Sequence, residues 1–152
     1  MYIGKSYAGG IIFYIDNTGE HGFICAENEQ STGAEWGCAG TDIPWANGTA
    51  VGTGVQNTID IEAGCTTTGT AADICANLSL NIYSDWFLLS IDELDLMYTN
   101  LHLKGFGGFT SDHYWSSSEG DIWNTRIINF SSGGHQLDQK DWTCYVRAAR
   151  AF

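Results

Sequence analysis

The chain has 152 residues, of which 43% are hydrophobic and 13% aromatic, with 19 glycines and a single proline. This length supports one hydrophobic core and is too short for two full-sized domains, so we expect a single domain over residues 1–152. The formal charge of −12 excludes nucleic acid as an expected partner, because a phosphate backbone would be repelled. The C-terminal segment contains three arginines, Arg126, Arg147 and Arg150, which could form a local cationic spot there.

No apolar run approaches the roughly 20 residues that a transmembrane helix needs, so we expect no direct membrane insertion. The first five residues do not begin a signal peptide. Two interpretations follow: the chain is part of a longer protein or assembly, or it is made without a secretion signal.

The five cysteines form no CxxC pair and no pairing with histidines that is typical of a structural zinc site, so the spacing of such a site is absent. Two alternatives stay open for Cys25, Cys38, Cys65 and Cys75. They form two disulfides in an oxidising compartment, or they are buried free thiols. Cys144 is the odd cysteine, and its irregular surroundings predict a surface position.

The first half of the chain predicts one hairpin and a long irregular stretch. Apolar runs flank the turn sequence Asn17-Thr18-Gly19-Glu20, which is typical of a β-hairpin over residues 9–26. From residue 27 to residue 69 the sequence is rich in Gly, Thr, Asn and Ala, which predicts turns and short pieces without a long element. We expect Trp36 and Trp45 to anchor this stretch in the core.

Two helices are predicted next. Thr70 is placed to cap the first, with Asp73 three residues on. Its apolar stripe consists of Ala71, Ile74, Cys75 and Leu78. Ser90 and Glu93 form a capping box for the second, which ends before Gly105. Its expected buried face consists of Ile91, Leu94, Met97, Tyr98 and Leu101.

The C-terminal half reads as β-structure. The expected strands are residues 114–118, 126–130 and 145–151. A hairpin, a loop region with helices and then a strand-rich half predict the α+β class. We expect Trp86 and Trp115 in the core. Trp123 and Trp142 have polar neighbours, and exposed aromatic side chains of this kind commonly dominate binding energy.

No motif for catalysis stands out in the sequence. There is no GxSxG, HExxH, Walker or GxGxxG pattern in a suitable context, and no EF-hand loop. We interpret the four histidines as structural and the acidic residues as a solvated surface. The sequence therefore predicts no catalytic residue, no metal ligand and no cofactor.

Seven stretches together resemble one known family. They are Gly9-Gly10-Ile11-Ile12-Phe13-Tyr14, residues 30–38, 52–54, 85–88 and 92–94, Tyr114-Trp115-Ser116-Ser117-Ser118-Glu119 and Val146-Arg147-Ala148-Ala149-Arg150-Ala151-Phe152. These stretches resemble the DUF1566 family, which includes the Fibrobacter succinogenes major paralogous domain and the C-terminal domain of the Legionella collagen-like adhesin. The resemblance implies a C-type lectin-like fold of the formylglycine-generating-enzyme-like subtype, with two helices, small antiparallel sheets and long loops. It also implies neighbouring N- and C-terminal strands and a ligand face in the C-terminal half.

The same family resembles the variable proteins of diversity-generating retroelements, in which mutagenesis replaces chosen codons near the C-terminus. Phe130, Gly133, Lys140, Thr143 and Tyr145 resemble its scaffold positions. The ligand-binding positions that we expect are Gly120, Asp121, Ile122, Trp123, Asn124, Arg126, Ile127, Asn129, Ser131, Ser132, His135, Leu137, Asp138, Asp141, Trp142 and Cys144. Strand periodicity supports part of this set: where Ile128 and Phe130 face the core, Ile127 and Asn129 face outward.

The chain departs from the related patterns at several positions. Leu89 stands where the family motif has proline. Calcium-dependent C-type lectins use a proline-containing loop and a Trp-Asn-Asp strand, whereas here Pro44 lies elsewhere and Trp123-Asn124-Thr125 lacks the acid. Calcium-dependent sugar binding is therefore not expected.

The first hypothesis is a non-enzymatic ligand-binding domain of receptor or adhesin type, on a bacterial cell surface or a phage virion. It binds a protein or glycan ligand on another surface, with Trp123 and Trp142 as anchors. The second is an oxidase of the formylglycine-generating type that uses Cys144, which needs a second cysteine, such as Cys75, brought close by folding. The third is a structural domain of a larger adhesin.

Overall fold

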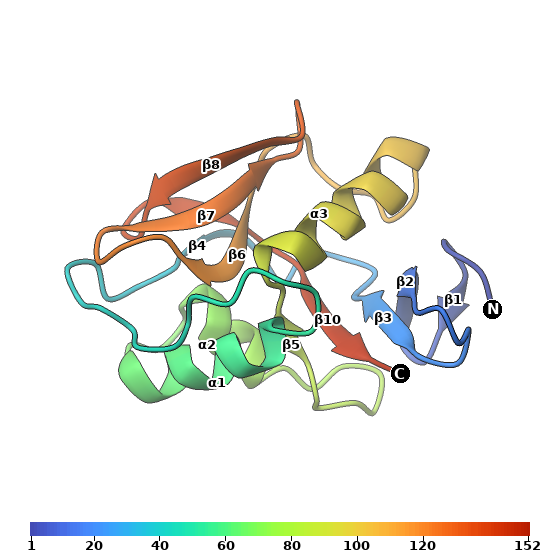
Figure 1. Ribbon diagram of the computed structural model, residues 1–152, viewed down its shortest axis with the longest axis horizontal. Coiled ribbons are helices and arrows are strands. Elements are labelled where there is room, and N and C mark those ends of the chain that lie inside the picture. The colour runs from blue at the N-terminus through green and yellow to red at the C-terminus, as the bar shows by residue number, and fades with distance from the viewer.

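The computed structural model describes residues 1–152 and contains two five-stranded sheets and three α-helices (Figure 1). The helices are α1 (Gly54–Gly64), α2 (Ala71–Ala76) and α3 (Ile91–Asn100), and a 3-10 helix follows at His102–Lys104. The predicted α+β class is confirmed. None of the helices has the length and apolar character needed to cross a membrane.

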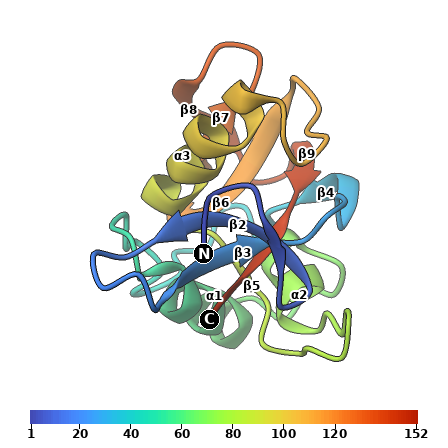
Figure 2. The same cartoon turned by 90° about the vertical axis from the view of Figure 1, so that its right-hand side faces the viewer.

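The first sheet has the strand order β1-β2-β3-β10-β5 and is antiparallel. Its strands are β1 (Ser6–Tyr7), β2 (Gly10–Ile15), β3 (Gly22–Cys25), β10 (Ala148–Ala151) and β5 (Phe87–Leu88). The predicted hairpin is β2–β3, in which Asp16 Oδ1 accepts hydrogen bonds from Thr18 N at 3.0 Å and Gly19 N at 3.1 Å. Phe152 N donates to Gly22 O at 3.1 Å, and the two chain ends lie on the same side of the molecule (Figure 2).

The second sheet has the strand order β4-β9-β6-β7-β8. Its strands are β4 (Ser31–Glu35), β9 (Thr143–Val146), β6 (His113–Glu119), β7 (Asn124–Asn129) and β8 (Gly134–Gln139). β6 and β9 are parallel, and the other pairs are antiparallel. In this strand order, β6 and β7 separate β8 from β9. Along the chain, however, only residues 140–142 connect β8 to β9. The sheet therefore curls, so that the end of β8 comes close to the start of β9.

Hydrophobic side chains cover both faces of the second sheet at β6 and at the C-terminal part of β7. On one face, Ile128 and Phe130 pack with α3 and with side chains of the first sheet. On the other, Trp115 and Ile127 belong to a cluster that includes side chains of α1 and α2. Ile127 and Ile128 are consequently both fully buried, and the prediction that Ile127 faces outward is wrong. Strand alternation alone cannot identify an outer face where a sheet is covered on both sides.

The two predicted helix caps are confirmed, whereas α1 was missed. Thr70 Oγ1 accepts from Asp73 N at 3.4 Å, and Ser90 and Glu93 make the capping box. α1 has no side-chain cap of its own. Instead, Glu93 Oε1 accepts from Gly52 N at 2.7 Å, so a carboxylate of α3 binds the N-terminus of α1. The prediction that residues 27–69 hold no long element is therefore wrong.

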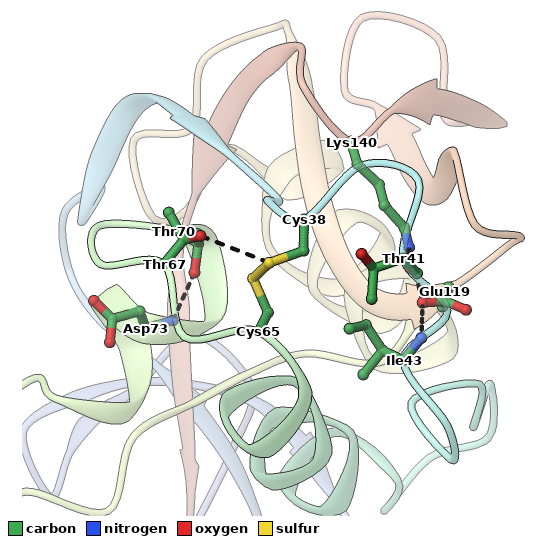
Figure 3. The surroundings of a disulfide bond; sticks show 9 residues. All are labelled: Cys38, Thr41, Ile43, Cys65, Thr67, Thr70, Asp73, Glu119 and Lys140. Carbon is green, nitrogen blue, oxygen red and sulfur yellow. Dashed lines mark hydrogen bonds and ion pairs between the residues drawn. A yellow bond between two sulfur atoms is a disulfide. The ribbon is translucent and has the colours of Figure 1, made fainter.

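The tryptophans and cysteines follow the predictions only in part. Trp36, Trp86 and Trp115 lie in the core, but Trp45 is 78% exposed and anchors nothing there. Neither cysteine alternative holds completely, because the structure has a single disulfide, between Cys38 and Cys65 (Figure 3). The remaining cysteines are free and buried: Cys25, Cys75 and Cys144.

Candidate ligand-binding face

Three buried serines of β6 support the candidate face from inside. Ser116 Oγ donates to Arg126 O at 2.6 Å. Ser118 Oγ donates to Gly48 O at 2.6 Å and accepts from Ile91 N at 2.9 Å. Ser117 Oγ accepts from the Asn57 side chain at 3.2 Å. Because all three hydroxyls bond to neighbouring segments, the serines of the Tyr-Trp-Ser-Ser-Ser-Glu motif are structural.

A buried ion pair continues this support; we call it the Glu119–Lys140 clamp. Lys140 Nζ lies 2.9 Å from Glu119 Oε2 and donates to Thr41 O at 2.9 Å. Glu119 Oε2 also accepts from Ile43 N at 2.9 Å (Figure 3). Burial raises the pKa of Glu119 above its ordinary value, although the hydrogen bond from Lys140 acts in the opposite direction. The clamp holds together the end of β6, the loop around residue 42 and the turn after β8.

Two turns stand above this clamp, the β6–β7 turn (residues 120–123) and the β8–β9 turn (residues 140–142). Lys140 N donates to Trp123 O at 2.9 Å, so the turns lie side by side. Asp121 Oδ1 accepts hydrogen bonds from Trp123 N at 2.7 Å and from Asn124 N at 2.8 Å. These bonds and one from the Asn124 side chain lower the pKa of Asp121, and the bond from Trp123 N has the largest effect. Trp123 and Trp142 are 57% and 51% exposed, as predicted.

A cleft of about 600 Å³ lies between the β7–β8 pair and the start of α3. Its lining consists of Thr49, Ile91, Asp92, Arg126, His135, Gln136 and Leu137. Arg126 stands opposite Leu137 in the β-ladder, and His135 Nε2 lies 2.9 Å from Asp95 Oδ1 of α3. Gly120 packs against Leu137, because a Cβ at Gly120 would lie 2.7 Å from Leu137 Cδ2. The cleft is therefore continuous with the β6–β7 turn.

The structure separates the predicted ligand-binding positions by burial. The exposed positions are Gly120, Asp121, Ile122, Trp123, Arg126, Ser131, Ser132, His135, Leu137, Asp141 and Trp142. Asn124 and Asn129 are half-buried. Ile127, Asp138 and Cys144 are buried, so these three side chains do not face a protein or glycan at the surface, and the prediction of a surface position for Cys144 is wrong. Ile127 packs in the core, whereas the short β8–β9 connection turns Asp138 and Cys144 toward each other under the curled sheet.

Several residues of the face were missed by sequence reasoning. Thr49, Ile91 and Asp92 reach the cleft from segments remote in sequence, and no local signal could have identified them. Gln136 lies between the predicted positions His135 and Leu137 and is exposed like both of them. Trp45 lies near the β6–β7 turn, because Glu119 N donates to Ala46 O at 2.7 Å. The neighbours of Trp45 in sequence include polar residues and glycine, like those of the exposed Trp123. This similarity is the signal that could have identified Trp45 as exposed.

The expected cationic spot does not form. Arg147 is buried in an ion pair with Glu29, and Arg150 Nε lies 2.6 Å from Asp85 Oδ1. Arg126 is the cation of the C-terminal segment that stays exposed. The arginines of the C-terminal motif are consequently scaffold residues.

Cys144 has polar neighbours that the sequence spacing did not reveal. Its thiol donates to Asp138 Oδ2 at 3.5 Å, and His113 Nδ1 lies 2.6 Å from the same oxygen. The group of possible ligand atoms around Cys144 contains no second cysteine. Burial, with the neighbouring Asp138 carboxylate, raises the pKa of the Cys144 thiol.

No protein-family model matches the sequence, and no curated protein matches it significantly.

Proposed function

We propose that this protein is a non-enzymatic binding domain of C-type lectin-like fold, related to the DUF1566 family. It is presented on a bacterial cell surface or a phage virion and binds a protein or glycan on another surface. The binding face consists of the β6–β7 turn, the β8–β9 turn and the adjoining cleft. The observation that carries the proposal is that most of the irregular segment's side chains are exposed on these elements, above a buried and hydrogen-bonded support.

The chemistry of the face suits recognition. Trp123, Trp142 and Leu137 offer large apolar surfaces, while Arg126 and Asp121 add charge beside them. Aromatic and arginine side chains dominate the energy of protein interfaces, and polar groups at the rim give specificity. Because the turns are held by backbone hydrogen bonds, little conformational entropy is lost when a ligand binds.

Replaceable side chains on a fixed support are also what a diversity-generating retroelement requires. Exposed positions of the face can change without loss of a core contact, whereas Lys140 and Phe130 stay constant in such a scheme. An imperfect repeat of this coding segment beside a reverse transcriptase gene, differing mainly at adenines, is the expected genomic arrangement. The disulfide between Cys38 and Cys65 favours an oxidising compartment, as at a cell surface.

The test uses arrays of glycans and of purified bacterial surface proteins, probed with the wild-type chain. A Trp123→Ala/Trp142→Ala double variant should lose at least about 30-fold in affinity for a bound ligand, because anchors of this type contribute 2 kcal/mol or more. Its free energy of unfolding should change by less than about 0.5 kcal/mol per exposed side chain. Ile82→Ala is the matched control, since Ile82 is an exposed apolar residue near the first sheet. Undiminished binding by the double variant would show that the face lies elsewhere.

A further inference from the structure

Three side chains from three strands of the second sheet meet beneath the β8–β9 turn. They are His113 of β6, Asp138 of β8 and Cys144 of β9. The Nδ1, carboxylate and Sγ atoms all lie within 4.8 Å of one another. His113 Nδ1 and Asp138 Oδ2 are 2.6 Å apart, and Cys144 Sγ and Asp138 Oδ2 are 3.5 Å apart. The curl of the sheet produces this group, which no sequence spacing indicates.

The burial of the group leaves one side open. The Asp138 side chain is 6% exposed and Cys144 is buried, whereas the His113 side chain is 31% exposed. An ion can therefore reach the group past the imidazole ring, while the carboxylate and the thiol stay fixed by packing. A buried set of this kind keeps its donor atoms convergent and does not need to be assembled on binding.

A second, independent observation is the hydroxyl of Thr125. Thr125 is fully buried, and its Oγ1 has no hydrogen-bond partner. It stands directly opposite Asp138 in the β7–β8 ladder, so both side chains are on the same face of the sheet. A buried hydroxyl without a partner is rare and requires an explanation, such as a water or an ion beside it.

We propose that His113, Asp138 and Cys144 bind a Zn²⁺ ion, with Thr125 Oγ1 bonded to a water that occupies the fourth position. Imidazole nitrogen, carboxylate oxygen and thiolate sulfur are the donors that zinc takes in proteins, and three protein ligands with one water form an open tetrahedral site. On binding, the thiol proton of Cys144 is released to solvent and His113 presents the lone pair of Nδ1.

The three donor atoms lie within 4.8 Å of one another, which is close to the spacing of zinc ligands. Tetrahedral ligands at zinc bond lengths are about 3.3–3.6 Å apart. The separation of 3.5 Å between Cys144 Sγ and Asp138 Oδ2 already matches. The His113–Asp138 pair must widen from 2.6 Å, which rotation of the half-exposed ring allows.

The site goes beyond the proposed binding function and does not depend on it. The zinc would join the end of β8 to the start of β9, directly below the turn that carries Trp142. Ligand binding by the face and metal binding beneath it are measured separately, so the failure of one proposal leaves the other intact.

The experiment titrates the metal-free chain of residues 1–152 with Co²⁺ as a spectroscopic probe, without reductant so that the disulfide stays intact. We expect binding of one equivalent, with a thiolate-to-cobalt charge-transfer band and the visible bands of tetrahedral cobalt, all abolished by added Zn²⁺. Cys144→Ser should lose the charge-transfer band. Cys75→Ala should keep it, because that thiol lies outside the group.

His113→Ala should weaken Co²⁺ binding at least about tenfold, as loss of a ligand requires. His135→Ala is its matched control, since His135 makes a similar contact of 2.9 Å with Asp95 on the surface and should leave the affinity unchanged. The proposal is overturned if the wild-type chain gives no thiolate band, or if Cys144→Ser retains it. Should Cys144→Ser fail to fold, undiminished affinity in the folded His113→Ala variant overturns it equally.

Discussion

The inner support of the second sheet and its outer face come from the same stretch of sequence but differ in almost every physical property. On the inside, Ser116, Ser118 and the Glu119–Lys140 clamp are buried, and each polar group is bonded to a neighbouring segment. On the outside, Trp123 and Trp142 are exposed on turns whose own backbone is fixed. The difference indicates that stability and recognition are assigned to separate side chains, which makes the outer ones replaceable.

The largest effect is expected at the clamp. Lys140→Ala leaves the buried Glu119 carboxylate without its cation, and breaking a buried ion pair in this way costs about 3–5 kcal/mol. Urea unfolding measures the change. The Lys140→Met/Glu119→Leu double variant is the control and should regain much of the loss, because it buries no unpaired charge. A cost below about 1 kcal/mol, as for a surface pair, would mean that the clamp does not support the face.

The disulfide should have the next largest effect. Replacing Cys38 and Cys65 together by serine opens a loop of 27 residues, and the chain-entropy relation gives a loss of about 3.5 kcal/mol. The measurement is again the free energy of unfolding. Because Cys38 and Ile43 belong to the loop that the clamp holds, binding by the outer face should also weaken. Equal stability of the oxidised and serine forms would argue against a closed bond in the folded protein.

A third comparison sets Ile127, which is buried against the prediction, beside Leu137, which is exposed on the proposed face. Ile127→Ala should cost about 3 kcal/mol, because it leaves a cavity beside Trp115 and Trp36. Leu137→Ala, on the exposed side of β8, should cost less than about 0.5 kcal/mol. Thermal and chemical unfolding of both variants check this difference. Similar costs at the two positions would remove the distinction between the inner and outer sides.

Glu62 of α1 lies outside both regions and provides a reference for the pH dependence of the free energy of unfolding. Burial, and then the nearby Asp73 carboxylate, raises the pKa of Glu62 from 4.5 to about 7. The folded state therefore binds this proton more tightly than the unfolded state, so the free energy of unfolding falls as pH rises from about 4.5 to about 7.

Glu62→Gln should flatten that part of the pH profile. At pH 8 it should stabilise the fold by less than about 1 kcal/mol, because solvent screens the half-exposed carboxyl. Glu20→Gln, on the exposed turn of the first hairpin, serves as the control. A variant at position 62 with the slope of the wild-type chain would contradict the expected direction.

Local signals in the sequence predicted the elements that stabilise themselves. The β2–β3 turn, the Thr70 cap and the Ser90–Glu93 capping box each involve residues within a few positions of one another. α1 could not be predicted in this way, because its N-terminus is bound by Glu93, a residue 39 positions from Gly54. Its β-branched residues and terminal glycines also disfavour a helix in isolation.

The candidate face was predictable where exposure follows from turn sequences and not where it depends on packing. Trp123 and Trp142 have polar neighbours along the chain and are exposed. Ile127 follows strand alternation in sequence, but both faces of β7 are covered, so alternation fails there. The meeting of Asp138 and Cys144 with His113 depends on the curl of the sheet, which is a property of the whole fold.

The most direct test replaces all exposed positions of the face except Gly120 at once. The positions are Asp121, Ile122, Trp123, Arg126, Ser131, Ser132, His135, Leu137, Asp141 and Trp142, exchanged for other polar and aromatic residues, while Gly120, Ile127, Asp138 and Cys144 are kept. We expect the same cooperative unfolding with a melting temperature changed by only a few degrees, together with a changed ligand preference. Loss of cooperative unfolding, or an unchanged ligand preference, would contradict this expectation.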